Sequence, residues 1–302
     1  MDPGGEVDID KYLTGKKRVI DAALGKIIPK ETDFPQSLHR AIRYTLFPGG
    51  KRIRPILAMA AYEVVGGKGN GILPYACGLE LIHTYSLIHD DLPALDNDNY
   101  RRGKPTTHRV FGEAMAILAG DALLTEAFHL MGREGLEGEA DPRAVIEVIG
   151  EISRAVGLAG MIAGQVVDIE SEGKKVELPI LEFIHTHKTG SLILVSVRTG
   201  GRLGGARDVE MEALTRYGKA IGLAFQITDD ILDVKGSRDS MGRPPGVDMA
   251  RDKITYPALL GVEESKRRCD ELIGQAIAAL ELFGNRGKHL REIANYIGKR
   301  NF

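Results

Sequence analysis

The stretch HTYSLIHDDLPALDNDNYRR, residues 83–102, decides how the rest of the chain is organised. It places Asp90, Asp91 and Asp96 close together and closes with the cations Arg101 and Arg102. Carboxylates at this density repel one another unless solvent or a cation relieves them. A cluster of oxygen ligands suits Mg²⁺, which usually keeps several waters and shares its other positions with substrate phosphates. Each arginine can fork onto two phosphate oxygens, so the stretch predicts a site for Mg²⁺ and a diphosphate.

The composition is that of an ordinary globular protein. Of 302 residues, 43% are apolar and 27% are charged, and the net charge of −2 gives no global attraction to nucleic acid or to an anionic membrane surface. Cys77 and Cys269 lie far apart and are interpreted as free thiols in a reducing compartment. The N-terminus lacks the apolar segment of a signal peptide, and no apolar run approaches the roughly 20 residues of a membrane span. We therefore expect a cytoplasmic protein.

The spacing of apolar residues predicts an all-α architecture. They recur at helical intervals along most of the chain, and alternating strand patterns are almost absent. No linker divides the chain, so we expect a single domain over residues 1–302. Long helices are predicted over residues 73–91, 113–131, 144–170, 181–201 and 209–234, with glycine- or proline-bearing connections between most of them.

The first acidic cluster cannot lie on one continuous helix. Asp90 and Asp96 are six residues apart, which would place them on different helix faces. Pro93 argues that the helix stops and that Asp96 returns from a loop. We therefore predict Asp90 and Asp96 as the pair that binds metal, with Asp91 in support.

A second acidic cluster comprises Asp229, Asp230 and Asp233. Asp229 and Asp233 are four residues apart, so they share a helix face. They follow an apolar run, where uncompensated carboxylates would be costly. Solvation of a helix end is the alternative explanation for one such cluster. Two clusters in one helical chain favour a metal-binding function instead.

Cations near these clusters suggest anion binding. Lys51, Arg52 and Arg54 follow a Gly-Gly turn at a helix start, where free N–H groups and the helix dipole favour an anion; a solvated basic helix start is the alternative. Arg101 and Arg102 either bind an anion or only neutralise the aspartates beside them.

Three further side chains are candidates for the same site. Lys188 lies in an otherwise apolar helix, so its ammonium is predicted to have a buried role. Lys253 follows a polar loop over residues 236–252, whose composition is typical of a lid that closes over phosphates. His83 lies two turns before Asp90 and is expected to share its helix face. A structural role is the alternative for a lone histidine.

With both acidic clusters in place, the chain resembles the trans-isoprenyl diphosphate synthases, and among them most closely the bacterial farnesyl diphosphate synthases. The resemblance runs in order from about residue 49 to residue 260. A single aspartate motif would be weak support, whereas this ordered set is specific. The matching segments are GGKRIRP (49–55), residues 83–108, GDAL (120–123), GQVVD (164–168), HKTG (187–190), GLAFQITDDILD (222–233) and KITYPAL (253–259).

The resemblance implies a bundle of helices around a central cavity, with the two aspartate clusters on opposite walls, and a homodimer. It implies three Mg²⁺ ions between the walls and the allylic diphosphate, two of them held through Asp90 and Asp96 and one through Asp229, with the remaining aspartates of both clusters close by. The allylic diphosphate would be held by Arg101, Lys188, Arg243 and Lys253. Arg243 stands where the family often has lysine. Isopentenyl diphosphate would be held by Gly50, Lys51, Arg54, His83 and Arg102.

The resemblance also implies the reaction. The allylic diphosphate ionises, with Mg²⁺ and cations stabilising the leaving oxygens. Isopentenyl diphosphate then attacks head to tail, while Lys188, Thr189 and Gln226 line the site of the allylic cation. No protein nucleophile is needed, and the sequence offers no convincing Ser–His–Asp or Cys–His arrangement.

Product length is expected to depend on the residues one helical turn before Asp90. In the family, an aromatic residue at the position of Tyr85, together with the Pro93–Ala94 insertion, goes with a C15 product, and Ser86 lies beside it. We therefore predict farnesyl diphosphate, with geranylgeranyl diphosphate as the alternative. Two rival functions are a terpene cyclase, which usually lacks the isopentenyl site, and a non-catalytic regulatory subunit, which tends to have lost an aspartate motif.

Overall fold

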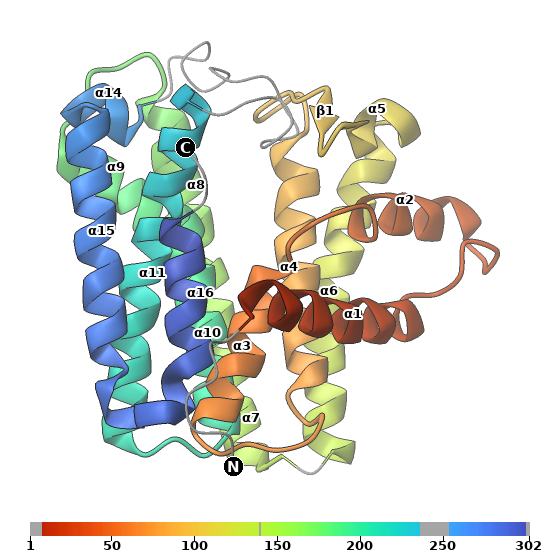
Figure 1. Ribbon diagram of the computed structural model, residues 1–302. Helices are drawn as coiled ribbons and strands as arrows, with labels where there is room; N and C mark the ends of the chain where they lie inside the picture. The colour runs from red at the N-terminus through yellow and green to blue at the C-terminus, as the bar shows by residue number, and fades with distance from the viewer. Residues whose placement is uncertain (1–7, 139, 236–253, 300–302) are drawn as a thin grey trace.

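The computed structural model describes residues 8–138, 140–235 and 254–299, and this part of the chain is almost entirely helical (Figure 1). Its longer helices are α1 (Ile9–Ile27), α2 (Gln36–Leu46), α3 (Ile53–Val64), α4 (Leu73–Asp90), α6 (Glu113–Glu137), α7 (Pro142–Val156), α8 (Met161–Ser171), α10 (Ser191–Leu203), α11 (Asp208–Lys235), α15 (Val262–Ala279) and α16 (Lys288–Gly298). Shorter elements are α5 (Thr107–Phe111), α9 (Leu178–Ile184), α14 (Tyr256–Leu260), the π-helix η1 (His185–Gly190), the 3₁₀-helix η2 (Glu281–Gly287) and the strands β1 (Tyr100–Arg101) and β2 (Lys104–Pro105). The predicted all-α fold is confirmed.

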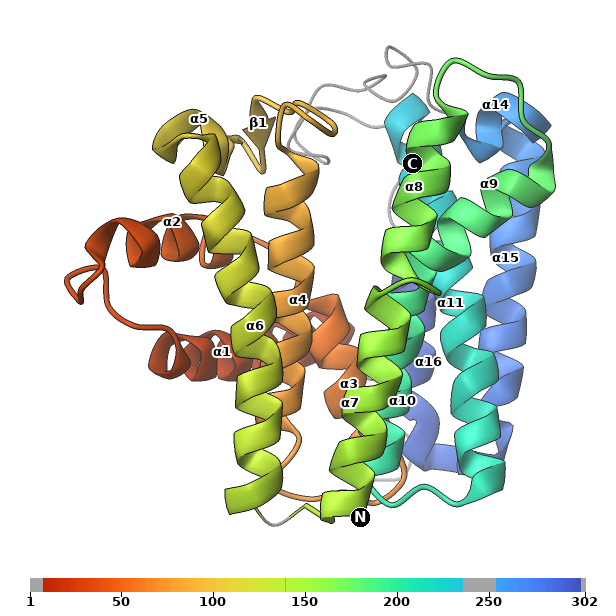
Figure 2. The same ribbon diagram turned by 180° about the vertical axis from the view of Figure 1, so that it is seen from behind.

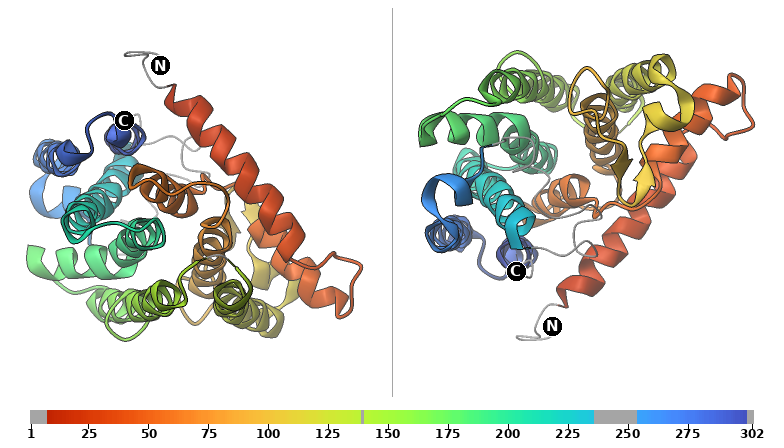
Figure 3. Two further views of the ribbon diagram at one scale, coloured as in Figure 1. Left: turned by 90° about the horizontal axis from the view of Figure 1, so that it is seen from below. Right: turned by 90° about the horizontal axis from the view of Figure 1, so that it is seen from above.

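Most of the long helices run side by side in one bundle. α4 packs on α6, α10 packs on α3 and α11, and α11 packs on α15. Figures 1 and 2 show α4 and α6 on one flank and α11, α15 and α16 on the other. Figure 3, which looks along the bundle, shows α1 crossing one side of these helices. The arrangement brings the C-terminal ends of α4 and α11 to the same end of the bundle (Figure 1).

The helices form because their apolar residues follow the helical period. In α7, Val145, Val148, Ile152 and Val156 are buried on one face, and Asp141 caps the start of the helix by accepting a hydrogen bond from the Arg143 amide. α4 is buried on several sides, in keeping with its continuous apolar sequence. Each large side chain removed from water in this way contributes about 1.5–3 kcal/mol.

A buried ion pair fixes the start of α3. Arg52 is 2% exposed, and its guanidinium donates to Glu80 on α4 (2.6 Å) and Asp21 on α1 (2.9 Å). Removing one partner of such a pair leaves an uncompensated buried charge. Arg52 therefore holds α1, α3 and α4 together, so the cations that follow the Gly-Gly turn have different roles.

Two helices differ from the sequence prediction. The segment over residues 144–170 is two helices, α7 and α8, because the chain breaks at Gly160: a Cβ there would lie 1.8 Å from the Ala155 carbonyl oxygen. The segment over residues 181–201 is interrupted by η1, a π-helix of six residues. π-helical turns are rare and are often found at functional sites. The cysteines are free and buried, as predicted.

α6 has the length and apolar composition of a membrane span, although the sequence predicts none. One face of α6 packs against α4, α2 and α7 within the bundle, as a core helix does. Its outward face carries the exposed side chains of Ile117 and Leu118. The apolar character of α6 therefore comes from a buried face and from an exposed apolar face.

Candidate active site

A cavity of about 490 Å³ opens at the end of the bundle where α4 and α11 terminate. Its walls come from the start of α3, from α4, from the β1–β2 hairpin, from η1 and from α11. Segments far apart in the sequence thus meet around one space. The cavity brings together the following predicted site residues: Gly50, Lys51, Arg54, His83, Arg101, Arg102, Thr189, Gln226, Asp229 and Asp230.

The first aspartate cluster forms at the end of α4, where the chain turns back. The helix ends at Asp90, and the Asp96 amide then donates to the Asp90 carbonyl oxygen at 2.8 Å. Asn97 has a positive φ of 49° and donates to the carbonyl of Leu92 at 3.0 Å, which closes the loop. Asp96 therefore returns from a loop to Asp90, as the position of Pro93 predicts.

Asp91 is buried beside Arg101. The Arg101 guanidinium donates to the Asp91 carboxylate at 2.6–2.7 Å and lies 3.5 Å from Asp98. Burial raises the pKa of Asp91 to about 6, although Arg101 acts in the opposite direction. Burial would lower the pKa of Arg101, but the nearby carboxylates, Asp91 first, carry it above its ordinary value. Arg101 is therefore held by the acidic cluster while it lines the cavity.

A two-residue turn positions the neighbouring arginine. β1 and β2 pair Arg101 with Lys104, and Arg102 and Gly103 between them both have positive φ, as in the tight turns of hairpins. The Arg102 guanidinium lies against Gly50, where a Cβ would approach it to 3.0 Å. Gly50 has a positive φ of 84°, which favours glycine, and the lack of a side chain there leaves space for the end of the Arg102 side chain.

The wall around His83 is electropositive. Burial lowers the pKa of His83 well below its ordinary value, and the charges of Arg54, Arg102 and Arg101 lower it further. The pKa of Arg102 is also lowered, by burial first and by the neighbouring arginines. Since these cations repel one another and keep the imidazole neutral, an anion bound between them would relieve the repulsion.

The opposite wall belongs to α11. Gln226 and Asp229 line the cavity one helical turn apart. Asp230 also borders the cavity but is buried: its Oδ2 lies 2.8 Å from Nε2 of His185 and accepts from the Tyr256 amide at 2.9 Å. Asp233 is 2% exposed. Asp229 is therefore the aspartate of this cluster that lines the cavity with a partly exposed side chain, while Asp230 joins α11 to η1 and α14.

Lys188 lies near the first aspartate cluster. Its Nζ donates to Asp168 on α8 at 2.7 Å. Burial would lower the pKa of Lys188, but Asp168, Asp90 and Asp96 raise it above its ordinary value. The ammonium therefore stays charged close to the first cluster. The Lys188 side chain is 20% exposed, so it is half-buried, and the role that the sequence assigns to it stays a prediction.

Close backbone packing sets the position of Lys188. A Cβ on Gly164 of α8 would lie 2.2 Å from the Lys188 backbone nitrogen, so only glycine lets α8 and η1 approach this closely. The sequence assigns no role to Asp168, although the segment that contains it matches the family pattern. Its spacing from Gly164, one helical turn, is the signal that could have identified it.

Tyr85 and Ser86 lie one turn before Asp90. Tyr85 is 6% exposed and stands edge-on to His89, with ring centroids 5.6 Å apart. Burial raises its pKa to about 12, so the hydroxyl stays protonated. Ser86 donates to the His83 carbonyl at 2.9 Å. Tyr85 is thus a fixed, uncharged ring within the α4 wall.

Some predicted residues cannot be placed. Arg243, Lys253 and the predicted lid over residues 236–252 lie outside the described residues. Their roles stay predictions. Among the residues that are described, no three acidic, histidine or cysteine side chains converge closely enough to form a metal site by themselves. A metal between the walls would therefore need oxygens from a substrate, which is the usual coordination of Mg²⁺ in phosphate chemistry.

The cavity has acidic groups on two walls and an electropositive pocket beside them. In a helical bundle, this arrangement is typical of enzymes that bind prenyl diphosphates. Comparison with known proteins agrees. The family model of polyprenyl synthetase matches residues 35–291. Geranylgeranyl pyrophosphate synthase 7, chloroplastic, of Arabidopsis thaliana is 47% identical over 97% of this chain and 84% of its own length. Farnesyl diphosphate synthase of Geobacillus stearothermophilus is 46% identical over 87% of this chain and 88% of its own. The solved apo structure of an FPP/GFPP synthase from Zymomonas mobilis has a TM-score of 0.85 at 35% identity, and covers 96% of this chain and 99% of that one.

The chain belongs to the polyprenyl synthetase family. It is therefore a prenyltransferase that acts on isoprenoid diphosphates. The members named above make different products, and so the family alone does not fix the product of this chain.

Proposed function

We propose that the chain, as one domain, catalyses the Mg²⁺-dependent head-to-tail condensation of isopentenyl diphosphate with dimethylallyl or geranyl diphosphate, releasing diphosphate. The observation that carries this proposal is the position of Lys188. Its ammonium is close to Asp90, Asp96 and Asp168, while the next residue, Thr189, lines the cavity that also contains Asp229. An ammonium beside the first aspartate cluster, next to a residue that lines the cavity, suits a metal-bridged diphosphate better than it suits a structural core.

The acidic walls fit Mg²⁺ in number and type of ligand. Asp90, Asp96 and Asp229 supply oxygens from two sides, and the allylic diphosphate would complete the coordination. When bound, Mg²⁺ supplies positive charge that stabilises the departing diphosphate. Lys188 and Arg101 add hydrogen bonds from fixed cations, because Asp168 and Asp91 hold them in place. Asp91 is buried and accepts hydrogen bonds from Arg101, so its role is to position Arg101.

The electropositive pocket suits the second substrate. Lys51, Arg54 and Arg102 can bind the diphosphate of isopentenyl diphosphate, and a neutral His83 can donate a hydrogen bond to it. Thr189 and Gln226 offer uncharged dipoles to the developing allylic cation. A charged carboxylate there could capture the cation, whereas an amide or hydroxyl can stabilise it while leaving it free to react.

We propose farnesyl diphosphate as the product because the buried ring of Tyr85 would stop the growing chain one turn below Asp90. Geranylgeranyl diphosphate is a second candidate, since relatives with that name are as similar to this chain as the farnesyl synthase is. A terpene cyclase would not need the pocket around Arg54 and Arg102. A regulatory subunit would not need to retain acidic residues on both walls.

We also propose a homodimer. Apolar side chains are exposed on neighbouring helices: Ile117 and Leu118 on α6, Ile146 on α7, and Ile162 and Val166 on α8 (Figure 2). Exposed apolar side chains on neighbouring helices are typical of an interface between subunits. A monomer by light scattering at micromolar concentration would contradict the proposal.

The test is incubation of the purified chain with labelled isopentenyl diphosphate, each allylic diphosphate in turn and Mg²⁺. We expect a C15 diphosphate that is not formed in excess EDTA. A C20 product would retain the reaction and reject Tyr85 as the limit of length. Absence of any condensation product with all allylic acceptors would reject the proposal.

A further inference from the structure

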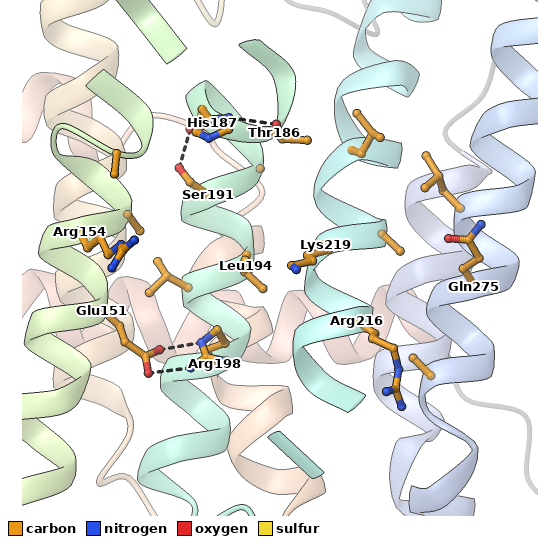
Figure 4. Close-up of a pocket in the computed structure, with 18 of the residues that line it drawn as sticks. Glu151, Arg154, Thr186, His187, Ser191, Leu194, Arg198, Arg216, Lys219 and Gln275 are labelled. Carbon is orange, nitrogen blue, oxygen red and sulfur yellow. Dashed lines mark hydrogen bonds and ion pairs between the residues drawn. The ribbon is translucent and has the colours of Figure 1, made fainter. Parts of the chain in front are cut away.

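A second and larger groove lies on the far side of η1 and α11 from the catalytic cavity. It has a volume of about 1030 Å³ and is lined by α7, η1, α10, α11 and α15 (Figure 4). Leu194, Leu223 and Leu272 form its floor, and each is partly accessible. None of the described side chains that line it is a phenylalanine or tyrosine, so its apolar contacts are mainly aliphatic, and the ring among them is the imidazole of His187.

Two cations stand over this apolar floor. Arg154 of α7 and Lys219 of α11 line the groove and are exposed. Figure 4 shows them projecting from opposite sides toward α10. Within the described part of the chain neither makes an ion pair or a side-chain hydrogen bond, whereas their neighbours do: Arg198 binds Glu151 at 2.7 Å and Arg216 binds Glu212 at 2.6 Å. The groove therefore presents uncompensated positive charge from two walls.

An aliphatic floor beneath unpaired cations matches one kind of ligand, an anion that carries a long apolar chain. Ligand sites are usually about 300–1,000 Å³ in volume, and this groove is at the upper end of that range. Two cations from different helices suit a diphosphate, which has charge and oxygens for both, better than a single carboxylate. The enzyme family acts on molecules with this combination of diphosphate and apolar chain.

The groove shares its wall with the catalytic cavity. Thr186, His187 and Gly190 of η1 face the groove, while Thr189 of the same π-helix faces the cavity. η1 and α11 touch without a side chain between them, since a Cβ on Gly222 would lie 3.1 Å from the Gly190 Cα. A ligand in the groove would therefore contact η1, the π-helix that contains Lys188.

We propose that this groove is a second binding site for a prenyl diphosphate, with the chain on the leucine floor and the diphosphate between Arg154 and Lys219. The proposal rests on the prenyl diphosphate chemistry of the family and not on a particular product length. Because both head-group ligands are cations, binding in the groove is independent of Mg²⁺, whereas binding of a prenyl diphosphate beside the aspartates of the catalytic cavity requires it.

The experiment measures calorimetric binding of farnesyl S-thiolodiphosphate, a prenyl diphosphate that resists ionisation. For the intact chain we expect two sites per subunit in Mg²⁺ and one in EDTA. Arg154→Ala/Lys219→Ala should weaken the EDTA-resistant site at least tenfold. Ala278→Trp, which fills the groove from an exposed position on α15, should also remove it. Both variants should keep the Mg²⁺-dependent site.

The matched control is Arg18→Ala/Lys26→Ala, which removes two exposed cations of α1 and should keep both sites. A single, Mg²⁺-dependent site in the intact chain would overturn the second site and leave the proposed function standing. No binding at all would count against both. Equal competition by palmitate at the EDTA-resistant site would overturn the assignment to a prenyl diphosphate. A change of oligomeric state in the groove variants alone would make the groove a subunit interface and would also overturn it.

Discussion

The backbone amide of Asp96 donates a hydrogen bond to the carbonyl oxygen of Asp90 across 2.8 Å. This contact returns the chain to the end of α4 and brings two carboxylates, six residues apart in sequence, to one place. Both aspartates are close enough to Lys188 to raise the pKa of its ammonium. The first aspartate cluster is thus made by a loop and a helix end together.

Asp90→Asn should reduce condensation at least about 100-fold, since even residues that only support metal ligands often contribute 10–100-fold. The substitution keeps the shape of the side chain and removes its charge. The Mg²⁺ concentration for half-maximal rate should rise in parallel. The measurement is initial rate against Mg²⁺ concentration. Asp270→Asn, at an exposed position of α15, is the control, and a loss of equal size there, or none for Asp90→Asn, would contradict the role of Asp90.

Tyr85→Ala should lengthen the product from C15 to C20 or beyond. Removing a buried ring opens space in the α4 wall where the chain grows. Tyr85→Phe is the matched control, because it keeps the ring and loses only the hydroxyl, and its product should stay at C15. Chromatography of the dephosphorylated products measures the distribution. An unchanged distribution for Tyr85→Ala would show that another residue limits the length.

Gly164→Ala should destabilise the fold by about 1–3 kcal/mol, the usual cost of overpacking. The added Cβ would lie 2.2 Å from the Lys188 nitrogen, and a backbone atom cannot move aside easily. The same substitution should raise the KM for the allylic diphosphate, because Lys188 shifts.

Gly150→Ala provides the comparison, since nothing lies within 4 Å of a Cβ there, in the middle of α7. It should stabilise the fold by about 0.5–1 kcal/mol through helix propensity. Denaturant unfolding measures both variants. Similar changes in the two unfolding free energies would contradict the proposed close contact between α8 and η1.

His83 should make the fold sensitive to acid. Its pKa in the folded protein is well below the value of about 6.5 expected in the unfolded chain. Above pH 6.5 the imidazole is neutral in both states, whereas below that pH the unfolded chain binds a proton and the folded one does not, so stability falls. Between pH 7 and pH 5 this should cost up to about 2 kcal/mol.

His83→Gln should therefore lose less stability than the natural chain over the same pH interval, as measured by denaturant unfolding at pH 7 and pH 5. The control is His129→Gln, an exposed position of α6, which should follow the natural chain. An equal loss of unfolding free energy between pH 7 and pH 5 in all three proteins would argue against a neutral His83 in the folded state.

The sequence predicts those parts of the site that depend on local rules. Pro93 implies that α4 stops, and the structure has the stop at Asp90 and the return of Asp96. The spacing of Asp229 and Asp230 could also have separated their roles, since adjacent helix residues do not face the same way. Asp230 indeed binds His185 and the Tyr256 amide.

The parts of the site that the sequence does not predict depend on contacts between distant segments. The pairing of Lys188 with Asp168 requires α8 and η1 to be in contact, and the spacing of apolar residues in the two segments does not predict that contact. The break at Gly160 is similar: the sequence predicts one helix over residues 144–170, whereas the close approach of Gly160 to the Ala155 carbonyl leaves no space for a side chain. The π-helix of η1 was not predicted either, because an α-helix and a π-helix share much of their apolar pattern.

The central claim is that Asp90, Asp96 and Asp229 hold metal ions and an allylic diphosphate from opposite walls of one cavity. It is tested most directly by a crystal structure with Mn²⁺ and farnesyl S-thiolodiphosphate, in which anomalous scattering locates the metals. We predict anomalous peaks bound to Asp90 and Asp96 on one side and to Asp229 on the other, with the diphosphate between them beside Lys188. A diphosphate bound in this cavity without metal, or metals bound to other residues, would contradict the account.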